Sequence, residues 1–263
     1  MDLHLEGRTA LVTGGTGGIG LATAAALARE GAKIIIAGRD HAKLDAALKE
    51  IRSSAAGEVI GIVANAATQQ GADAIVTQAP EIDILINNLG FHEIKAFTSI
   101  TDEDWLHLFE TNVLSGIRLA RYLLPSMLTK NWGRIIFVSS STAISTPAMM
   151  VHYGMTKTAE LAISRGLAEQ TKGTAVTVNA VLPGPIQNAG MLSDVRSMLG
   201  GSKDSDAEVE KTFFKTHYTT SLLQRLIEPA EVADLIAFLV SQRALAINGA
   251  ALHIDGGATP TVV

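Results

Sequence analysis

The feature that most constrains the fold of this chain is a regular alternation of short apolar runs with longer segments of helical periodicity. The runs are rich in β-branched residues and continuously apolar, as in strands whose two faces are both covered by helices. They span residues 9–13, 33–37, 58–64, 82–88, 134–140, 174–182 and 251–255. Right-handed crossovers between them predict an α/β fold with a single, doubly wound parallel sheet of about seven strands.

Length and composition favour one large domain. The chain has 263 residues, of which 47% are hydrophobic and 18% charged, and no Pro-, Gly- or Ser-rich linker divides it, so we expect a single domain over residues 1–263. A net charge of −5 argues against a nucleic-acid surface. The absence of cysteine excludes disulfides and thiolate chemistry, and the histidines show no ligand spacing, so we predict no metal. Without a signal sequence or a membrane-length apolar run, we expect a cytoplasmic protein that contacts no membrane.

The region 189–218 interrupts this alternation before the last predicted helix. The Gly200–Gly201 pair predicts a hinge, and Ser205 followed by Glu208 fits a capping box. Because the region follows the sixth strand at the carboxyl end of the sheet, where such folds bind ligands, we interpret it as a substrate lid. A passive surface loop is the alternative. Its apolar residues favour a partly hydrophobic substrate; they are Met191, Leu192, Met198, Leu199, Phe213 and Phe214.

The stretch TGGTGGIG, at the end of the first predicted strand, fits two glycine spacings used for dinucleotides. Gly15, Gly17 and Gly20 satisfy G-x-G-x-x-G. Gly14, Gly18 and Gly20 satisfy the wider T-G-x-x-x-G-x-G. The stretch itself leaves both spacings open.

Four polar residues are candidates for chemistry. Tyr153 and Lys157 lie four residues apart on a predicted helix and therefore share a face. Ser140 closes the fifth predicted strand, at the same sheet edge as the glycine-rich stretch. Asn112 falls within a long predicted helix, where a buried asparagine is unfavourable and needs a reason.

In order and spacing, these pieces resemble the short-chain dehydrogenase/reductase family over almost the whole chain. The matching pieces are TGGTGGIG, NNLG (87–90), Asn112, Ser140, YGMTK, PGPI (183–186) and GAALHIDGG (249–257). The resemblance implies a Rossmann fold and an oxidoreductase similar to 3-oxoacyl reductases, acting on a carbonyl or a secondary alcohol. It also implies the wider glycine spacing, with the pyrophosphate at the N-terminus of the following helix.

The resemblance implies catalytic roles for Asn112, Ser140, Tyr153 and Lys157. Tyr153 would be the general acid or base, Ser140 would bond the substrate oxygen, Asn112 would hold a relay water, and Lys157 would bind the nicotinamide ribose. A phenol pKa near 10 needs about 4 kcal/mol to reach neutrality, and an ammonium about 4 Å away supplies roughly that much. We therefore expect Lys157 to make Tyr153 acidic.

The cofactor expected from the residues is NADP(H) rather than NAD(H). Gly38 stands where NAD enzymes carry an acid, and Arg39 offers donors to a 2′-phosphate, unless it merely packs over the adenine. Asp40 is expected to cap the next helix instead. The candidate cofactor-binding residues are Gly14, Thr16, Gly18, Ile19, Gly20, Arg39, Asn65, Asn88, Gly90, Tyr153, Lys157, Pro183, Gly184 and Ile186.

Several residues carry less certain expectations. Asn65 stands where the family often has Asp, and Asn188 where it often has Thr; we expect adenine binding to survive the first change, and the second puts a nicotinamide contact in doubt. His92 either lines the pocket or faces solvent. His152 is expected to be a packing residue.

These features predict an NADP(H)-dependent oxidoreductase for a partly apolar ketone, aldehyde or alcohol, with a 3-oxoacyl thioester as one example. A non-catalytic NADP(H)-sensing protein is the alternative, although a sensor has no need of an acid and its neighbouring cation. A sugar epimerase or dehydratase is a third candidate, which the short chain disfavours. The resemblance also implies a homo-oligomer, a tetramer or a dimer, with the helices around Asn112 and Tyr153 between subunits.

Overall fold

The computed structural model, which describes residues 2–79 and 81–262, forms one parallel sheet with the strand order β3-β2-β1-β4-β5-β6-β7. The strands are β1 (Thr9–Thr13), β2 (Lys33–Gly38), β3 (Val59–Val63), β4 (Ile84–Asn87), β5 (Gly133–Val138), β6 (Val176–Pro183) and β7 (Ala251–Ile254). All six neighbouring pairs are parallel, so the carboxyl ends of the strands meet at one edge. The doubly wound sheet predicted from the sequence is confirmed.

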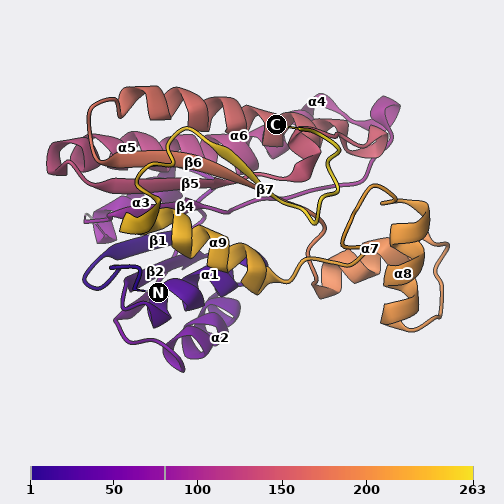
Figure 1. Cartoon of the computed structure of the whole chain (residues 1–263), viewed down its shortest axis with the longest axis horizontal. Helices are drawn as coiled ribbons and strands as arrows, with labels where there is room; N and C mark the ends of the chain where they lie inside the picture. The colour runs from indigo at the N-terminus through magenta and orange to yellow at the C-terminus, as the bar shows by residue number, and fades with distance from the viewer. Residues whose placement is uncertain (1, 80, 263) are drawn as a thin grey trace.

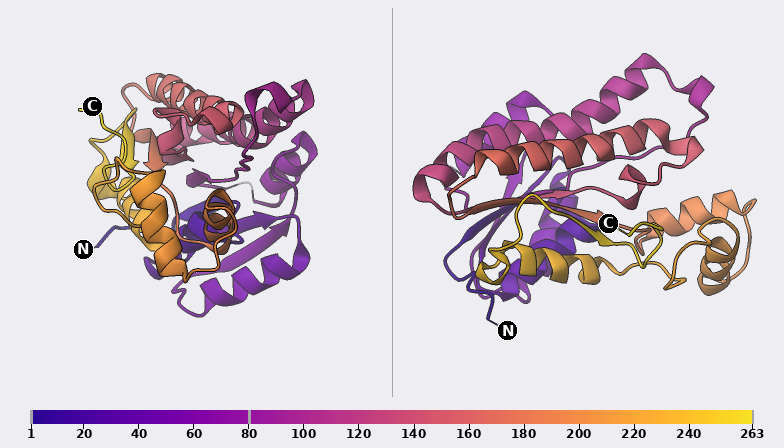
Figure 2. Two further views of the ribbon diagram at one scale, coloured as in Figure 1. Left: turned by 90° about the vertical axis from the view of Figure 1, so that its right-hand side faces the viewer. Right: turned by 45° about the horizontal axis from the view of Figure 1, so that its top comes forward.

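Helices cover both faces of the sheet (Figures 1 and 2). One face carries α1 (Gly18–Arg29), α2 (His41–Arg52) and α9 (Pro229–Val240); the other carries α3 (Gln69–Gln78), α5 (Ser115–Lys130) and α6 (Val151–Gln170). Alternate residues of a strand supply the two apolar cores. Val12 belongs to the core under α1 and α9, whereas its neighbour Leu11 belongs to the core under α3 and α5. Burial on both faces is why the strands are continuously apolar.

The ends of the helices follow local signals in the sequence. Asp40 caps α2 by accepting a hydrogen bond from the backbone N–H of Lys43, as expected. Ser205 and Glu208 form the predicted capping box of α8 (Asp206–Thr216). The single long helix expected before β5 is instead three consecutive pieces: α4 (Asp102–Leu108), a π-helical segment (Phe109–Leu114) and α5.

The segment from α7 (Ala189–Met198) through α8 projects from the carboxyl edge of the sheet (Figure 1, right). It has an apolar cluster of its own, formed by Val195, Val209, Phe213, Phe214 and Leu226. Met191, Leu192 and Leu199 pack against that cluster. The interpretation of Phe213 and Phe214 as an indication of substrate polarity is therefore wrong. An excursion this far from the main cores buries its large side chains in its own core to be stable.

Within residues 2–79 and 81–262, none of the helices combines the length and the apolarity needed to cross a bilayer.

Close packing of α3 on the turn after β3 depends on Gly71. A Cβ atom at Gly71 would lie 1.9 Å from the carbonyl oxygen of Asn65, which belongs to the backbone and cannot rotate away. We predict that Gly71→Ala lowers the free energy of unfolding by about 3 kcal/mol, the upper range for overpacking. Chemical denaturation followed by circular dichroism measures this. The control is Gly166→Ala in α6, where nothing lies within 4 Å of the added carbon. Equal unfolding midpoints for the two variants would contradict the prediction.

Candidate active site

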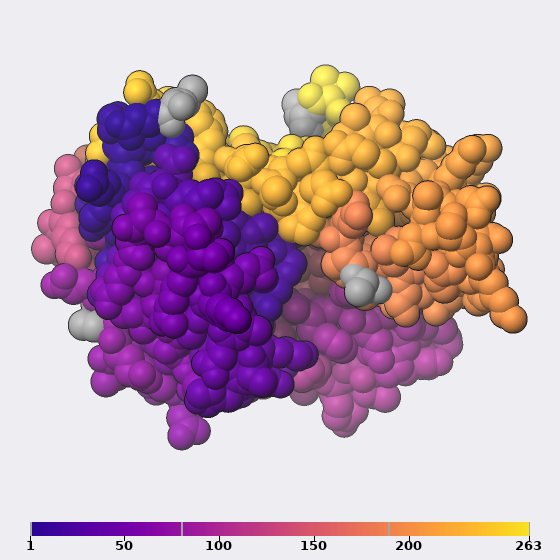
Figure 3. Space-filling model, turned by 90° about the horizontal axis from the view of Figure 1, so that it is seen from below, coloured from indigo at the N-terminus to yellow at the C-terminus, as the bar shows by residue number. Residues whose placement is uncertain are grey.

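A pocket of about 250 Å³ opens at the carboxyl edge of the sheet, between the N-terminal half of the chain and the projecting helices. A recess is visible there in the space-filling view (Figure 3). The pocket joins the start of α1, the loops after β4, β5 and β6, and the start of α6. Its lining residues are Gly18, Ile19, Asn88, Gly90, Phe91, His92, Val138, Ser139, Tyr153, Lys157, Ile186 and Asn188. The glycine-rich turn and the Tyr153–Lys157 pair, far apart in sequence, therefore share one cavity.

The backbone of the glycine-rich turn distinguishes the two glycine spacings. Gly14 and Gly18 have φ values of 63° and 51°, which disfavour other residues. A Cβ atom at Gly20 would lie 2.4 Å from the carbonyl oxygen of Gly14, so α1 can approach the turn only with glycine there. Gly15 packs against Ile36 of the sheet, and Gly17 is extended with open space beside it. The positions with special backbone requirements on the ligand side are those of the wider spacing.

Hydrogen bonds from Thr13 and Asn88 fix this turn to β4. The Thr13 hydroxyl donates to the carbonyl oxygen of Ile86 and accepts from the N–H groups of Asn88 and Leu89. The Asn88 amide donates to the carbonyl oxygens of Thr13 and Gly14, at 3.0 and 3.3 Å. The chain reverses its winding direction between β1 and β4, which is where doubly wound sheets bind ligands. These bonds therefore hold the glycine-rich turn beside that crevice.

Tyr153 and Lys157 project from the first turns of α6 into this pocket. The Lys157 ammonium lies 5.7 Å from the centre of the Tyr153 ring. Ser140 lies in the loop after β5. Its hydroxyl interacts with the phenol, and it also caps a short 3₁₀ turn by accepting from the N–H of Thr142. Three of the four expected chemical groups thus converge at one point.

Lys157 is almost fully buried and is held by protein groups on several sides. Its Nζ donates to the carboxylate of Glu160 at 2.9 and 3.1 Å and to the carbonyl oxygen of Val138 at 2.9 Å. The hydroxyl of Ser139 donates to the Lys157 carbonyl oxygen at 2.8 Å, which joins α6 to the end of β5. The position of the ammonium is therefore set by the strand as well as by its own helix.

The pKa of Tyr153 depends on more groups in the protein than Lys157, the one considered from the sequence. Burial is the largest effect on the pKa of Tyr153 and raises it. The Lys157 charge and the Ser140 hydroxyl lower this pKa, the Glu160 carboxylate raises it, and the net direction is upward. Burial lowers the pKa of Lys157, but Glu160 reverses the direction, so that this pKa is raised. The expected lowering by Lys157 is therefore present, and desolvation and the counterion oppose it.

Asn112 lies in the π-helical segment and is buried behind the pocket. Its amide nitrogen donates to the carbonyl oxygen of Phe91 at 2.9 Å and to the hydroxyl of Thr156 at 3.0 Å, and its oxygen accepts from the N–H of Phe91 at 2.8 Å. The helix distortion thus places a polar side chain between the loop after β4 and α6. Single-turn π distortions of this kind are common at functional sites.

The remaining candidate residues lie along the same edge, on both sides of the pocket. A Cβ atom at Gly38 would lie 2.8 Å from the methyl group of Thr16, so an acidic side chain does not fit there without a shift, and the neighbouring Arg39 is exposed. Asn65 accepts from the N–H of Ala67. On the opposite side, Pro183 ends β6, Gly184 packs against the backbone of Asp255, and Ile186 lines the pocket.

Several lining residues were not predicted from the sequence. Val138 is the last residue of β5, and Phe91 and Ser139 belong to the loops after β4 and β5, whose direction depends on tertiary packing. Glu160 had a usable signal, since it lies three residues after Lys157 on one helix, a spacing that favours an ion pair. His92 lines the pocket, with its ring edge-on to that of Tyr153 at 5.9 Å.

Two contacts connect the projecting helices to the site. His92 Nε2 lies 3.2 Å from the carboxylate of Asp194 in α7. The hydroxyl groups of Tyr218 and Ser141 lie 2.9 Å apart, immediately beside Ser140. Asn188 both lines the pocket and caps α7 through the N–H of Met191. His152, in contrast, is fully buried, with its ring against Trp105, so its expected packing role is confirmed.

The sequence and the fold were compared with those of known proteins. The sequence model described as short chain dehydrogenase matches residues 8–200. An uncharacterized oxidoreductase, YvaG, of Bacillus subtilis is 44% identical over the full length of both chains. The 3-oxoacyl-[acyl-carrier-protein] reductase FabG of Vibrio cholerae is 30% identical, over 97% of this chain and 98% of its own.

Solved structures also match over almost the whole chain. L-sorbose reductase from Gluconobacter frateurii, complexed with NADPH and L-sorbose, superposes with a TM-score of 0.93 at 28% identity and full coverage of both chains. An NAD⁺-bound xylitol dehydrogenase superposes with a TM-score of 0.86 at 25% identity, covering 97% of this chain and all of its own. Chains similar to this one therefore bind either nicotinamide cofactor.

Proposed function

Because the chain belongs to the short-chain dehydrogenase/reductase family, oxidoreductases of CH–OH and C=O groups, we propose that it is an NADP(H)-dependent carbonyl reductase or alcohol dehydrogenase with Tyr153 as its general acid or base. The observation that carries the proposal is the shared pocket. It places the open backbone of Gly18, at the start of α1, in the same cavity as the Tyr153 phenol and the Lys157 ammonium.

The glycine-rich turn fits a dinucleotide. No side chain caps the first turn of α1, and no atom lies within 4 Å of a Cβ built at Gly17 or Gly18, so the N–H groups there are accessible to a pyrophosphate. Gly14 and Gly20 bring the helix and the turn together beneath this position. Along the rest of the edge, the residues proposed to complete the cofactor site are Thr16, Ile19, Arg39, Asn65, Asn88, Gly90, Pro183, Gly184 and Ile186.

When bound, the nicotinamide supplies or accepts the hydride. In the proposed reduction, the Tyr153 hydroxyl protonates the carbonyl oxygen of the substrate, and the Ser140 hydroxyl donates a hydrogen bond to the same oxygen. Lys157 stabilises the phenolate that remains, because its ammonium lies close to the ring. Asn112 fixes the loop that carries Phe91 against α6, which positions one wall of the pocket.

Preference for NADP(H) is proposed from the end of β2. A side chain at Gly38 would meet Thr16, and no acid stands there to bind a ribose hydroxyl. Arg39, exposed beside it, offers a planar set of donors suited to a phosphate. The NADPH complex of L-sorbose reductase supports this choice.

The proposed substrate is a partly apolar ketone, aldehyde or secondary alcohol. Ile19, Phe91, Val138 and Ile186 give the pocket apolar walls, while the polar groups gather around Tyr153. We propose that residues 189–218 form the lid over this pocket, since His92 contacts Asp194 and Asn188 lines the cavity. A 3-oxoacyl thioester combines a reducible carbonyl with an apolar chain, and the similarity to FabG supports that class.

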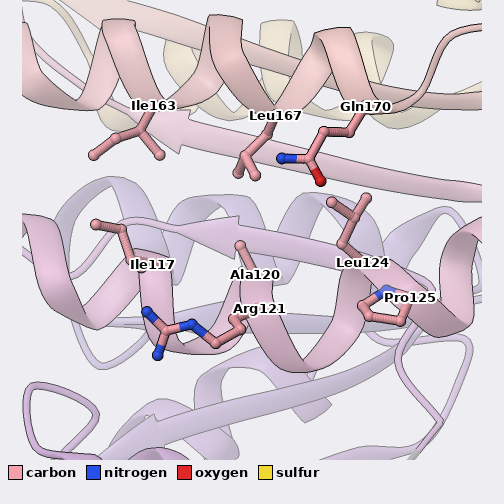
Figure 4. A pocket seen from close by; sticks show the side chains of 8 residues that line it. All are labelled: Ile117, Ala120, Arg121, Leu124, Pro125, Ile163, Leu167 and Gln170. Atoms are coloured by element: carbon pink, nitrogen blue, oxygen red, sulfur yellow. The ribbon is translucent and has the colours of Figure 1, made fainter.

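A homo-oligomer is proposed from a groove on the outer surface of α5 and α6. The groove, of about 350 Å³, lies between Ile117, Ala120 and Leu124 of α5 and Ile163 and Leu167 of α6 (Figure 4). The helix α5 follows Asn112, and α6 carries Tyr153; the family resemblance places the helices around these two residues between subunits. Burying this apolar strip against a second copy would remove it from water.

The decisive variant for the catalytic role is Tyr153→Phe. We predict that it lowers kcat/KM for ketone reduction by at least about 10²-fold, because the proton donor is removed while the ring stays in place. Loss of NADPH absorbance across ketones graded by chain length and polarity, with NADH in parallel, measures this. Tyr122→Phe, at an exposed tyrosine of α5, is the matched control. Unchanged ketone reduction by Tyr153→Phe would refute the proposal.

The variant Arg39→Ala tests the cofactor preference. We predict that its KM for NADPH rises about 10- to 100-fold, the range for losing charged hydrogen bonds, while its KM for NADH changes little. Arg29→Ala, at an exposed arginine near the end of α1, serves as the control. A parallel loss for both cofactors would mean that Arg39 contacts the adenine rather than a phosphate.

The variant Ile163→Glu tests the proposed interface. A carboxylate in the α5–α6 groove would have to lose its water on association, so we predict dissociation to smaller species at micromolar concentration. Sedimentation velocity measures this, with Arg39→Ala as a control remote from the groove. A wild-type protein that sediments as a monomer would rule out the homo-oligomer.

A further inference from the structure

Glu160 is a buried carboxylate beside the catalytic lysine, and none of the steps above uses it. It lies on α6, one turn after Lys157, and its side chain is 3% exposed. Both of its oxygens accept hydrogen bonds from Lys157 Nζ, at 2.9 and 3.1 Å. A buried carboxylate is costly unless it is paired, so this contact is the reason that Glu160 can be there.

The pair changes the charge that Tyr153 experiences. An isolated ammonium would stabilise the phenolate, whereas an ammonium paired with a carboxylate acts as a dipole with a weaker field. Glu160 also keeps Lys157 protonated despite its burial. Glu160 therefore acts on the phenol in two opposite ways. By keeping Lys157 charged it favours the phenolate, and by repelling the phenolate directly it raises the pKa of Tyr153.

Other groups near the phenol leave this balance in place. Ser140 bonds the phenol from the loop after β5, and the His92 ring faces it from the loop after β4. Asp194 approaches His92 from α7, at the exposed rim of the pocket, where solvent screens its charge. Glu160 is thus the carboxylate that acts on Tyr153 from within the protein.

We propose that Glu160 is a positioning residue that offsets the charge of Lys157 and so favours the protonated form of the Tyr153 phenol, which can then donate its proton to a carbonyl oxygen. The inference rests on the proposed function. With a bound reduced nicotinamide supplying hydride to the carbonyl carbon, the π electron pair of the carbonyl would take the phenol proton, and the phenolate would be reprotonated from solvent. Alcohol oxidation, which needs the phenolate, would be favoured as the pH rises.

The ionisation of Tyr153 can be measured without turnover. The chain has three tyrosines, so tyrosinate absorbance titrations of each protein, minus the same titration with Tyr153→Phe added, isolate this residue. Glu160→Gln removes the charge but keeps a hydrogen-bond acceptor for Lys157, and it should move the Tyr153 titration about one pH unit lower. Glu160→Asp, which restores the charge, should return it toward the wild-type position. Glu160→Asn provides a second neutral variant if Glu160→Gln does not fold.

The matched control is Glu169→Gln, which neutralises an exposed glutamate on the same helix and should leave the titration unchanged. An unshifted Tyr153 in the neutral variants, or a shift to higher pH, would overturn the proposal. In active protein, the pH limbs of kcat/KM for reduction and oxidation should move with the titration, which a purely structural role would not cause. A wild-type protein that reduces no ketone would refute the proposed function, while the absorbance titration would still decide the role of Glu160.

Discussion

The hydrogen bonds that join Thr13 and Asn88 across β1 and β4 are the interaction on which the site depends. These two strands lie side by side where the winding direction reverses, so the loops that follow them diverge and leave a crevice. Without these hydrogen bonds, the glycine-rich turn would have few side-chain contacts to fix its conformation. Asn88 supplies the missing contacts from the neighbouring strand, and the start of α1 is thereby aimed at the crevice rather than away from it.

The electrostatics of the site come from a second constraint, the burial of three ionisable groups along one helix. Tyr153, Lys157 and Glu160 project successively from α6 toward the end of β5, where Val138 offers only a carbonyl oxygen. Burial raises the pKa of Glu160 to about 7 even with the ammonium beside it. The acidity of the phenol thus depends on all three groups and on their burial, not only on the distance between Tyr153 and Lys157.

Much of the architecture could be predicted because it follows from local chemistry. The apolar runs predicted where the strands lie. The polar residues Asp40 and Ser205 predicted the first residues of α2 and α8. The π-helical segment around Asn112 could not be predicted, because it depends on a hydrogen-bonding partner in a distant loop. The burial of Phe213 could not be predicted either, since a sequence does not show which apolar residues form the core of a projecting segment. The candidate catalytic residues came from the family resemblance, whereas the pairing of Lys157 with Glu160 came from the structure.

The bond between Tyr218 and Ser141 has an evolutionary consequence. The projecting segment has an apolar core of its own and contacts the sheet edge through this hydrogen bond. Substitutions in its helices can therefore accumulate without disturbing the sheet. Selectivity for a different substrate can then arise when relatives exchange the projecting segment, provided that the new segment has a hydroxyl group that bonds Ser141. A grafted segment without this hydroxyl would lose one of the two side-chain contacts to the pocket and keep the other, between Asp194 and His92.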